Sequence, residues 1–360
     1  MSEDYSVKFD RNLLRFFRGA VAKSRLNLAT SAFLARACLD QRRAVSQRAK
    51  WGRRGVQVPP MMIVSITNRC NLNCVGCYAH AIHAAPEAEM DDRRLFELVD
   101  EADELGVSII LIAGGEPLLR PAFFELAWLH PRILFLVFTN GLLLNETNVD
   151  LFRRMRNLIP VLSLEGEQME TDMRRGNGIY RLVEERMRAL KKKGLFFGTS
   201  LTLTRQNHDL ITSVDFQRNL SSLGSSISFF VDYVPVKPGT ESLVLTPEQK
   251  QGEAEWMKRL NDEVGGLFVA LPGDEDQYGG CLAGGRGFIH VNPQGRLEAC
   301  PFAPFSDTDL NEMSLKEALG SKLMRVIRQN ANQLSERKGG CTLWENRDWV
   351  LAQMKQAESE

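Results

Sequence analysis

The sequence predicts an α/β protein built around a parallel sheet. From residue 61 to residue 236, apolar runs of strand length alternate with amphipathic runs of helix length, which is typical of βαβ units. Two of the apolar runs, 108–113 and 133–138, are almost uninterrupted, as expected of strands buried on both faces. The chain has 360 residues, 44% of them hydrophobic and 25% charged, which is sufficient for a large core. The spacing fits a doubly wound sheet and a barrel equally well.

The first 58 residues predict a basic, amphipathic helical extension. Apolar residues between 10 and 50 recur at helical spacing among arginines. Residues 1–55 hold 13 Lys and Arg against four Asp and Glu, although the whole chain has a formal charge of zero. We expect a pair of helices packed on the outside of the main domain, with a solvated basic face. The alternative is a peripheral contact of residues 10–50 with a membrane surface or an acidic partner.

Residues 59–245 are predicted to form the core domain. Its six expected strands cover 61–67, 108–113, 133–138, 159–164, 196–204 and 227–236. Helices are expected between them, at 91–105, from 121, and at 147–157, 179–193 and 209–223. Asp91 and Gly106 are of the residue types that begin and end a helix. Because loops after parallel strands gather at one edge of a sheet, we expect the functional residues to lie there.

The most distinctive segment follows the first expected strand and reads Cys70-Asn-Leu-Asn-Cys74-Val-Gly-Cys77. Three thiolates so close together fit a zinc ion with a fourth ligand, or an iron–sulfur cluster. A four-iron cube needs four ligands, so a loop that offers three leaves one iron open to another molecule. The spacing alone leaves zinc and a cluster equally open, with unligated cysteines as a third alternative.

Together with the turn Gly114-Gly-Glu-Pro117 after the second strand, this loop resembles the radical SAM superfamily. The resemblance covers about residues 60–245, extends more weakly to about 345, and implies a curved, incomplete (β/α)6 barrel. It implies that S-adenosylmethionine (SAM) binds the open iron of an Fe4S4 cluster held by Cys70, Cys74 and Cys77. A reductant such as flavodoxin or ferredoxin would then supply the electron that cleaves SAM to a 5′-deoxyadenosyl radical.

The resemblance also implies the residues that contact SAM. It assigns this role to Gly76, Tyr78, Gly114, Gly115, Glu116, Pro117, Ser163, Arg175 and Val236. Glu116 would meet the α-amino group of SAM, and the two glycines would let the backbone approach the ligand. The family usually has an aromatic residue where this chain has Gly76, so Tyr78 is expected to take over its packing. Ser200 and Asn140 are weaker candidates, and no catalytic acid or base is assigned.

Residues 246–360 are predicted to form a smaller C-terminal domain. A helix from Thr246, a hairpin (287–291 and 296–300) and a helix at 314–328 separate three further cysteines, which are Cys281, Cys300 and Cys341. This layout resembles the twitch or SPASM extension of radical SAM enzymes, and implies a second, auxiliary Fe4S4 cluster. Its fourth ligand would be His290, Asp276 or the substrate. The alternative is a degenerate domain without metal.

Charge and composition narrow the function. A net charge of zero does not favour nucleic acid, and neither a signal peptide nor an apolar run of membrane-spanning length is evident. A reducing cytoplasm is expected, with peripheral contact at the inner membrane face as an alternative. The leading hypothesis is hydrogen abstraction from a peptide, a small metabolite or a lipid. The alternative is a non-enzymatic zinc or iron–sulfur protein that regulates or scaffolds, and a methyltransferase ranks lower because no cobalamin region is apparent.

Overall fold

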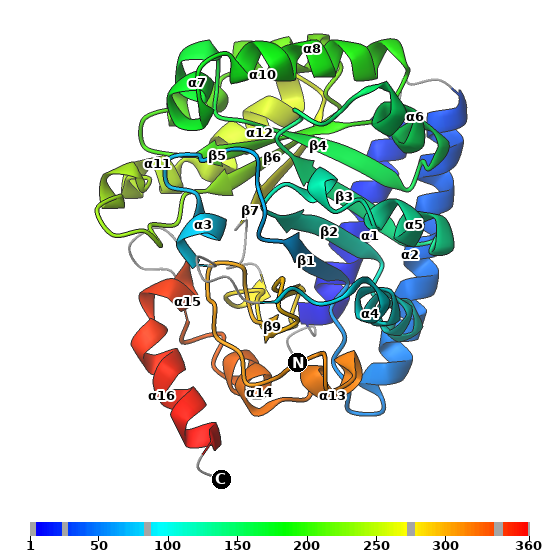
Figure 1. Ribbon diagram of the computed structural model, residues 1–360, viewed down its shortest axis with the longest axis vertical. Helices are drawn as coiled ribbons and strands as arrows, with labels where there is room; N and C mark the ends of the chain where they lie inside the picture. Colours follow the sequence, from blue (N-terminus) through cyan, green and yellow to red (C-terminus); the bar gives the residue numbers. More distant parts are fainter. Residues whose placement is uncertain (1–4, 24–27, 83–87, 272–277, 335–340, 359–360) are drawn as a thin grey trace.

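The computed structural model describes residues 5–23, 28–82, 88–271, 278–334 and 341–358. Its centre is one curved sheet with the strand order β7-β6-β5-β4-β3-β2-β1-β8-β9 (Figure 1). The strands are β1 Met61–Thr67, β2 Ile109–Gly114, β3 Leu134–Thr139, β4 Leu158–Leu164, β5 Gly198–Leu203, β6 Ile227–Asp232, β7 Leu267–Leu271, β8 Phe288–Val291 and β9 Leu297–Glu298. Strands β1 to β7 are parallel to their neighbours, as the alternating sequence pattern predicted. The expected α/β partial barrel is therefore confirmed.

The helices between the strands lie close to their predicted positions. They are α3 Tyr78–Ile82, α4 Asp92–Leu105, α5 Phe123–Leu129, α6 Glu146–Arg154, α7 Gln168–Arg175, α8 Ile179–Lys192, α9 His208–Ile211 and α10 Val214–Ser222, with the 3-10 turns η1 Pro117–Leu119 and η2 Glu241–Leu243. Asp91 caps α4 by accepting a hydrogen bond from the amide of Arg94, and Gly106 ends it at φ 99°. Both predicted ends of this helix are confirmed.

The sheet continues beyond residue 245, where the sequence pattern indicated that alternation stops. After α11 Pro247–Gln251 and α12 Glu253–Glu263, strand β7 pairs in parallel with β6. This strand was missed because it has five residues, lies at the edge of the sheet and is mostly half-exposed. The predicted hairpin is present as β8 and β9, but β8 also pairs in parallel with β1 and so joins the same sheet. The chain then forms α13 Leu315–Leu319, α14 Lys322–Gln329, α15 Thr342–Glu345 and α16 Arg347–Glu358.

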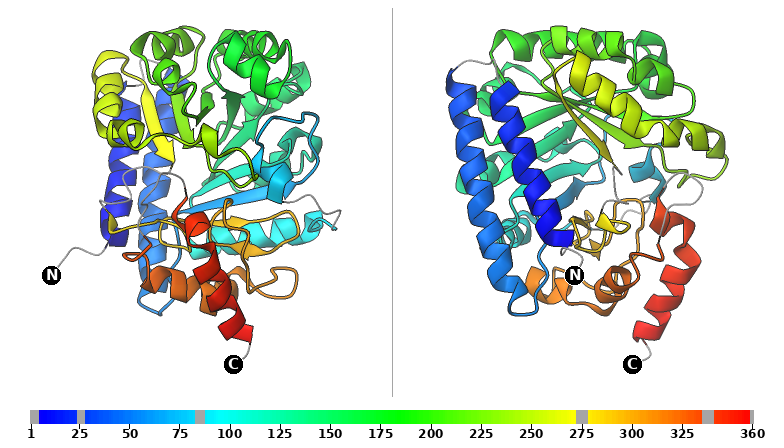
Figure 2. Two further views of the ribbon diagram at one scale, coloured as in Figure 1. Left: turned by 90° about the vertical axis from the view of Figure 1, so that its left-hand side faces the viewer. Right: turned by 180° about the vertical axis from the view of Figure 1, so that it is seen from behind.

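The N-terminal helices pack differently from the expectation. Helices α1 Tyr5–Lys23 and α2 Leu28–Gly52 run side by side (Figure 2) and pack against the inner face of the sheet, not on the outside of the barrel. Phe17 of α1 is 4% exposed and shares an apolar cluster with Ile109 and Leu136. The apolar side of α1 is thus used within the fold, which leaves less of it for a membrane surface. Among the described helices, none is long and apolar enough to span a bilayer.

One buried ion pair fixes these two helices. Arg48 of α2 donates to the carboxylate of Asp10 on α1 at 2.6 Å and to the carbonyl of Gly106 at 2.6 Å. Gly106 precedes β2, so this contact holds the helices at the amino ends of the strands. Burial lowers the pKa of Arg48, while the nearby Asp10 carboxylate opposes that shift.

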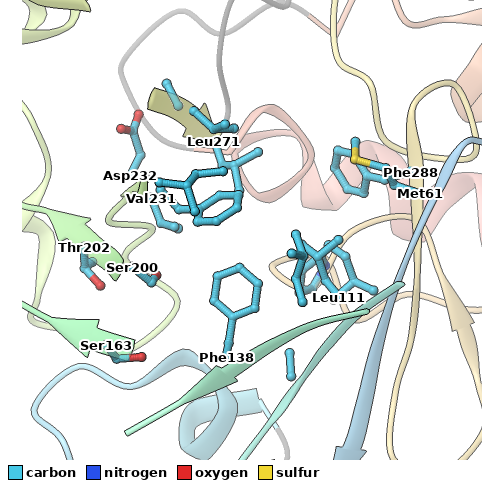
Figure 3. A pocket seen from close by; sticks show the side chains of 18 of the residues that line it. Met61, Leu111, Phe138, Ser163, Ser200, Thr202, Val231, Asp232, Leu271 and Phe288 are labelled. Atoms are coloured by element: carbon cyan, nitrogen blue, oxygen red, sulfur yellow. The ribbon is translucent and has the colours of Figure 1, made fainter. Parts of the chain in front are cut away.

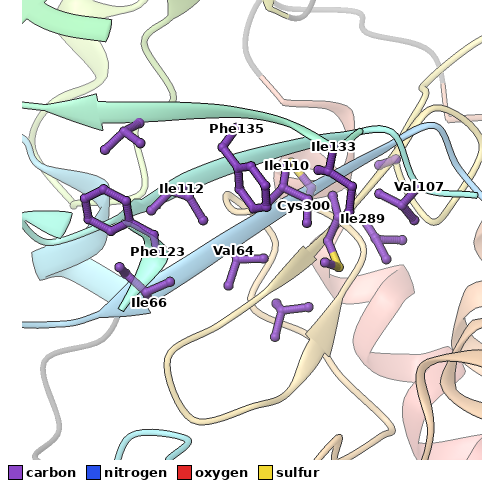
Figure 4. Close-up of a cluster of buried hydrophobic side chains, with 14 of the residues drawn as sticks. Val64, Ile66, Val107, Ile110, Ile112, Phe123, Ile133, Phe135, Ile289 and Cys300 are labelled. Atoms are coloured by element: carbon purple, nitrogen blue, oxygen red, sulfur yellow. The ribbon is translucent and has the colours of Figure 1, made fainter. Parts of the chain in front are cut away.

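The outer face of the sheet carries the main core. Val64, Ile110 and Phe135 point to this side and are at most 2% exposed (Figure 4). Ile289 of β8 and Cys300, just past β9, belong to the same cluster. The C-terminal hairpin is therefore packed into the core of the barrel.

Candidate active site

A cavity of about 850 Å³ runs through the inside of the barrel. Its lining includes all six cysteines that the sequence singled out, Cys70, Cys74, Cys77, Cys281, Cys300 and Cys341. Figure 3 shows Ser163, Ser200 and Asp232 on one side of this space, and Leu111 and Phe288 on the other. The first three cysteines follow the carboxyl end of β1, where the sequence predicted that functional residues would gather.

The first cysteine loop is held in shape by backbone contacts. The amide of Leu72 donates to the thiol of Cys70 at 3.5 Å. The amide of Val75 donates to the carbonyl of Arg174 at 2.9 Å, and the guanidinium of Arg174 donates back to the carbonyl of Val75. Burial raises the pKa of Cys70 and of Cys74, so a bound metal would have to displace a proton from each thiol.

The Gly114–Pro117 turn is tied to the same loop. The amide of Gly115 donates to the carbonyl of Thr67 at 2.7 Å, and the amide of Glu116 to that of Arg69 at 2.8 Å. A Cβ atom on Gly115 would lie 2.1 Å from the Arg69 carbonyl oxygen, and Gly114 has φ 114°. The backbone just before Cys70 comes so close to both positions that it leaves no room for a side chain, so glycine is required at positions 114 and 115. Both also line the cavity.

Glu116 is buried beneath this turn. Its carboxylate accepts hydrogen bonds from the hydroxyl of Thr139 at 2.7 Å, the amide of Asn140 at 2.8 Å and the amide of Leu118 at 3.1 Å. Burial raises the pKa of Glu116, and these hydrogen bonds oppose the shift. A carboxylate has about four acceptor positions, so about one remains. Neither Glu116 nor Pro117 is part of the cavity lining.

A buried carboxylate after β4 holds two arginines. Glu165 is 1% exposed and pairs with Arg174 at 2.5 Å and with Arg175 at 2.6 Å. Both guanidinium groups line the cavity near Cys74. The sequence predicted Arg175 but neither Arg174 nor Glu165, although Arg174 is adjacent in the chain. Two cations against one carboxylate leave one net positive charge beside the cysteine loop.

A tyrosine from another strand occupies the space beside Gly76. A Cβ atom on Gly76 would lie 2.5 Å from the hydroxyl of Tyr233 and 3.1 Å from its ring. Tyr233 follows β6, is 3% exposed, and its hydroxyl has no hydrogen-bond partner. Tyr78, which was expected to take over this packing, instead contacts Phe302 at 5.0 Å between ring centroids. Burial raises the pKa of the Tyr78 hydroxyl, with Cys77 and Cys300 nearby.

The remaining predicted SAM contacts separate into two groups. Ser163 on β4 lines the cavity and is in register with Ser200 on β5, which also lines it. Asn140 lines it too, and donates to the side chain of Asn71 at 2.7 Å. Val236, in contrast, is buried in the main core and is not among the lining residues.

The three C-terminal cysteines lie near one another in the lining of the cavity. Cys281 precedes β8, Cys300 follows β9 and Cys341 caps α15, and each is at most 8% exposed. A hydrogen bond with Cys341 and burial raise the pKa of Cys300, and Cys281 adds to this effect. The amide of Ala283 donates to the thiol of Cys281 at 3.5 Å, as Leu72 does to Cys70. Backbone donors to sulfur are among the factors that tune iron–sulfur clusters.

The suggested fourth ligand His290 is already engaged. Its Nδ1 lies 2.7 Å from Glu298 and its Nε2 lies 2.8 Å from the hydroxyl of Ser65, while the side chain is fully buried. With both ring nitrogens occupied, His290 is not available as a ligand here. Asp276, the other side chain considered, lies outside the described residues.

Within the described parts of the chain, no three His, Cys, Asp or Glu side chains converge on a point suited to one metal ion.

Comparison with known proteins identifies the domain around the first cysteine loop. Residues 64–216 match the model of the Radical SAM superfamily. They form a radical SAM domain. Such a domain uses an Fe4S4 cluster and SAM, and the chain is accordingly an enzyme of the radical SAM type. The non-enzymatic regulator or scaffold is set aside.

Several known proteins are similar to this chain. The AdoMet-dependent heme synthase of Methanosarcina barkeri is 25% identical over 317 residues, covering 80% of this chain and 88% of that protein. The mycofactocin maturase MftC of Mycobacterium tuberculosis is 27% identical over 269 residues, covering 69% of this chain and 66% of that protein. Streptococcus suis SuiB bound to precursor peptide SuiA shares the fold, with a TM-score of 0.60 at 16% identity over 78% of this chain and 69% of that one.

Proposed function

We propose that this radical SAM enzyme holds two Fe4S4 clusters that face one substrate cavity. The SAM-binding cluster is assigned to Cys70, Cys74 and Cys77, and an auxiliary cluster to Cys281, Cys300 and Cys341. The observation that carries the proposal is that all six thiols line the same cavity although they come from distant parts of the chain. When bound, the reduced cluster and SAM supply a 5′-deoxyadenosyl radical that removes a hydrogen atom from the substrate.

In this proposal, the protein binds and orients SAM. Gly114 and Gly115 present backbone to the cavity. Glu116 lies beneath them, outside the cavity lining, and fixes the backbone of the neighbouring Asn140, which does line it. Arg175, with the net positive charge that the two arginines leave beside Glu165, would bind the carboxylate of SAM. Ser163 and Ser200 would bind the ribose from the cavity wall, and the ring of Tyr233 would supply the aromatic packing that is absent at Gly76.

The auxiliary cluster has three protein ligands in this proposal. His290 is excluded as the fourth ligand by its two hydrogen bonds, and the thiols themselves line the cavity. The fourth iron of a cluster at this site would be left for the substrate or for Asp276, which lies outside the described residues. A cluster held by these three cysteines would supply either a binding position for the substrate or an acceptor for its electron. A reductant such as flavodoxin or ferredoxin would supply the electron that cleaves SAM at the first cluster.

The extents assigned to the three parts of the chain follow from this function. Residues 1–58 close the amino end of the barrel, residues 59–245 carry the SAM-binding cluster, and residues 246–360 carry the auxiliary cluster. The substrate is a molecule that reaches both cysteine sets. SuiB was solved with a precursor peptide and the Methanosarcina barkeri relative is named a heme synthase, so the relatives differ in substrate.

The test is anaerobic quantification of iron and sulfide after reconstitution. Wild type and the variant Cys281→Ala/Cys300→Ala/Cys341→Ala are compared, with Cys38→Ala as a matched control for the loss of a partly buried thiol outside both sets. We expect about eight irons per chain in wild type and in the control, and about four in the triple variant. About four irons in all three proteins would remove the auxiliary cluster, and zinc in place of iron would remove the radical mechanism.

A further inference from the structure

The amino-terminal half of the cavity differs from the half that faces the first cysteine loop. We define the deep chamber as the part lined by Leu13, Phe16 and Phe33 of α1 and α2, and by Ile109, Leu134 and Phe229 of the strands. The strand residues lie in the first half of their strands, away from the carboxyl ends where the first cysteine loop lies. Helices α1 and α2 also lie outside the residues that match the superfamily model, so this chamber is not part of that match.

The charged residues of the cavity are confined to its other end. Among the described residues, those with charged side chains in the lining are Arg174 and Arg175 after β4, Asp232 at the end of β6 and Glu253 at the start of α12. The two arginines pair with Glu165, and Asp232 pairs with Lys250. A ligand with several negative charges, such as a porphyrin with four carboxylates, would therefore meet no cluster of cations without paired carboxylates among these lining residues.

The few polar groups near the deep chamber satisfy one another. The side-chain amide of Asn12 donates to the hydroxyl of Tyr278 at 2.8 Å, and its carbonyl oxygen accepts from Arg15 at 3.2 Å. Phe9 packs against the ring of Tyr278 at 5.3 Å. Burying a polar ligand group there would leave it without a partner, which is unfavourable.

The deep chamber is part of a cavity of ligand-binding size, which it shares with the space assigned to SAM and to both clusters. Protein interiors are close-packed and have few voids larger than a water molecule. A cavity of about 850 Å³ lies within the range of small-molecule sites, and the chemistry of its lining defines what binds. Apolar cavities bind apolar molecules, because the free energy falls when apolar groups move from water into an apolar cavity.

We propose that the deep chamber binds a neutral, hydrocarbon-rich segment of the substrate. This inference rests on the function proposed above, and adds the class of substrate. The hydrocarbon segment lies between α1 and the strands, and the carbon that loses hydrogen lies at the other end, beside Ser163 and the first cysteine loop. Helix α1 then limits the space for the segment, because Leu13 and Phe16 line this chamber.

The test measures binding of radiolabelled 1-dodecanol to the anaerobically reconstituted full-length enzyme by equilibrium dialysis. With saturating SAM present, we expect saturable binding at one site, and at least tenfold weaker competition by 1-hexanol because it lacks six methylene groups. Leu13→Trp shortens the chamber, so we expect at least tenfold weaker dodecanol binding while hexanol binding is retained. Arg18→Trp places the same side chain on the exposed side of α1 and is expected to bind like wild type.

Other outcomes would overturn the inference. Three results would do so: SAM displaces dodecanol, wild type and Leu13→Trp bind dodecanol equally, or a highly charged ligand competes as strongly as unlabelled dodecanol. The probe for the third is Fe-coproporphyrin III, a porphyrin with four carboxylates. Phe33→Trp on α2 gives a second route to a shortened chamber if Leu13→Trp does not fold. Iron is quantified in the same samples. Two clusters without dodecanol binding would reject the hydrocarbon segment alone, whereas missing clusters would reject the proposed function.

Discussion

At the scale of single residues, the cysteine loop shows one compensating pair. Gly76 stands where relatives usually have an aromatic side chain, and Tyr233 brings a ring to that place from the end of β6. The guanidinium of Arg174 lies 5.9 Å from the centre of the same ring. Sequence motifs identified Gly76 as the departure, but they did not identify Tyr233, because a contact between residues 157 positions apart leaves no local pattern.

Replacing Gly76 by alanine tests this packing. At φ 67° an alanine is strained, and its Cβ would meet the Tyr233 hydroxyl, so we expect a loss of about 2 kcal/mol or more in the free energy of unfolding. In Gly76→Ala/Tyr233→Phe the hydroxyl is gone, so the second change should recover part of the loss. Chemical denaturation of the four proteins forms a double-mutant cycle. If the two single substitutions change the free energy of unfolding by amounts that add up fully in the double variant, Gly76 and Tyr233 are not in direct contact.

At the scale of elements, α7 positions the first cysteine loop. Glu165 comes directly after β4 and pairs with the last two residues of α7, and Arg174 is bonded to Val75. The sequence predicted a polar site after this strand, because strand ends can be located from apolar runs. It did not predict which arginine reaches which partner, since that depends on how a short helix turns back toward the sheet.

Loss of the Glu165 carboxylate should loosen this arrangement. Glu165→Ala leaves two buried guanidinium groups without their anion, so we expect a loss of about 3–5 kcal/mol in the free energy of unfolding. The exposed pair Arg181–Glu185 on α8 gives the control, because its side chains are 82% and 53% exposed. Glu185→Ala should change stability by about 0.5 kcal/mol or less. Similar losses in both variants, measured by denaturation of the reconstituted enzyme, would show that the buried network contributes little.

The elements that were predicted are marked by patterns in neighbouring residues, whereas the features that were missed depend on contacts between distant parts of the chain. Strand β1, with buried residues on both faces, matches its prediction, and Asp91 and Gly106 mark both ends of α4. The inward packing of α1 and α2 was not predicted, because an amphipathic helix shows that it buries one side but not which surface covers it. The same limit applies to β8, whose hairpin is evident in sequence while its pairing with β1 is not.

At the scale of the whole molecule, strands of one sheet lead to a member of each cysteine set. β1 leads to Cys70, and β9 leads to Cys300. Between them, His290 on β8 bridges Ser65 on β1 and Glu298 on β9. Because the bridge is fully buried, the C-terminal region is joined to the core by both packing and hydrogen bonds. We therefore expect the two regions to unfold together.

Replacing His290 by leucine tests this coupling. The variant leaves the Ser65 hydroxyl and one oxygen of the Glu298 carboxylate without their partner, so we expect a loss of about 3 kcal/mol in the free energy of unfolding. During denaturation of the reconstituted enzyme, absorption from the clusters and circular dichroism from the helices should be lost at one shared midpoint, lower than in wild type. Arg296→Ala, in the exposed part of the same hairpin, should leave the midpoint nearly unchanged. The contrary result is two separate unfolding transitions in wild type, of which only the later one shifts in His290→Leu. The His290 bridge would then stabilise the barrel alone, and the C-terminal region would fold independently.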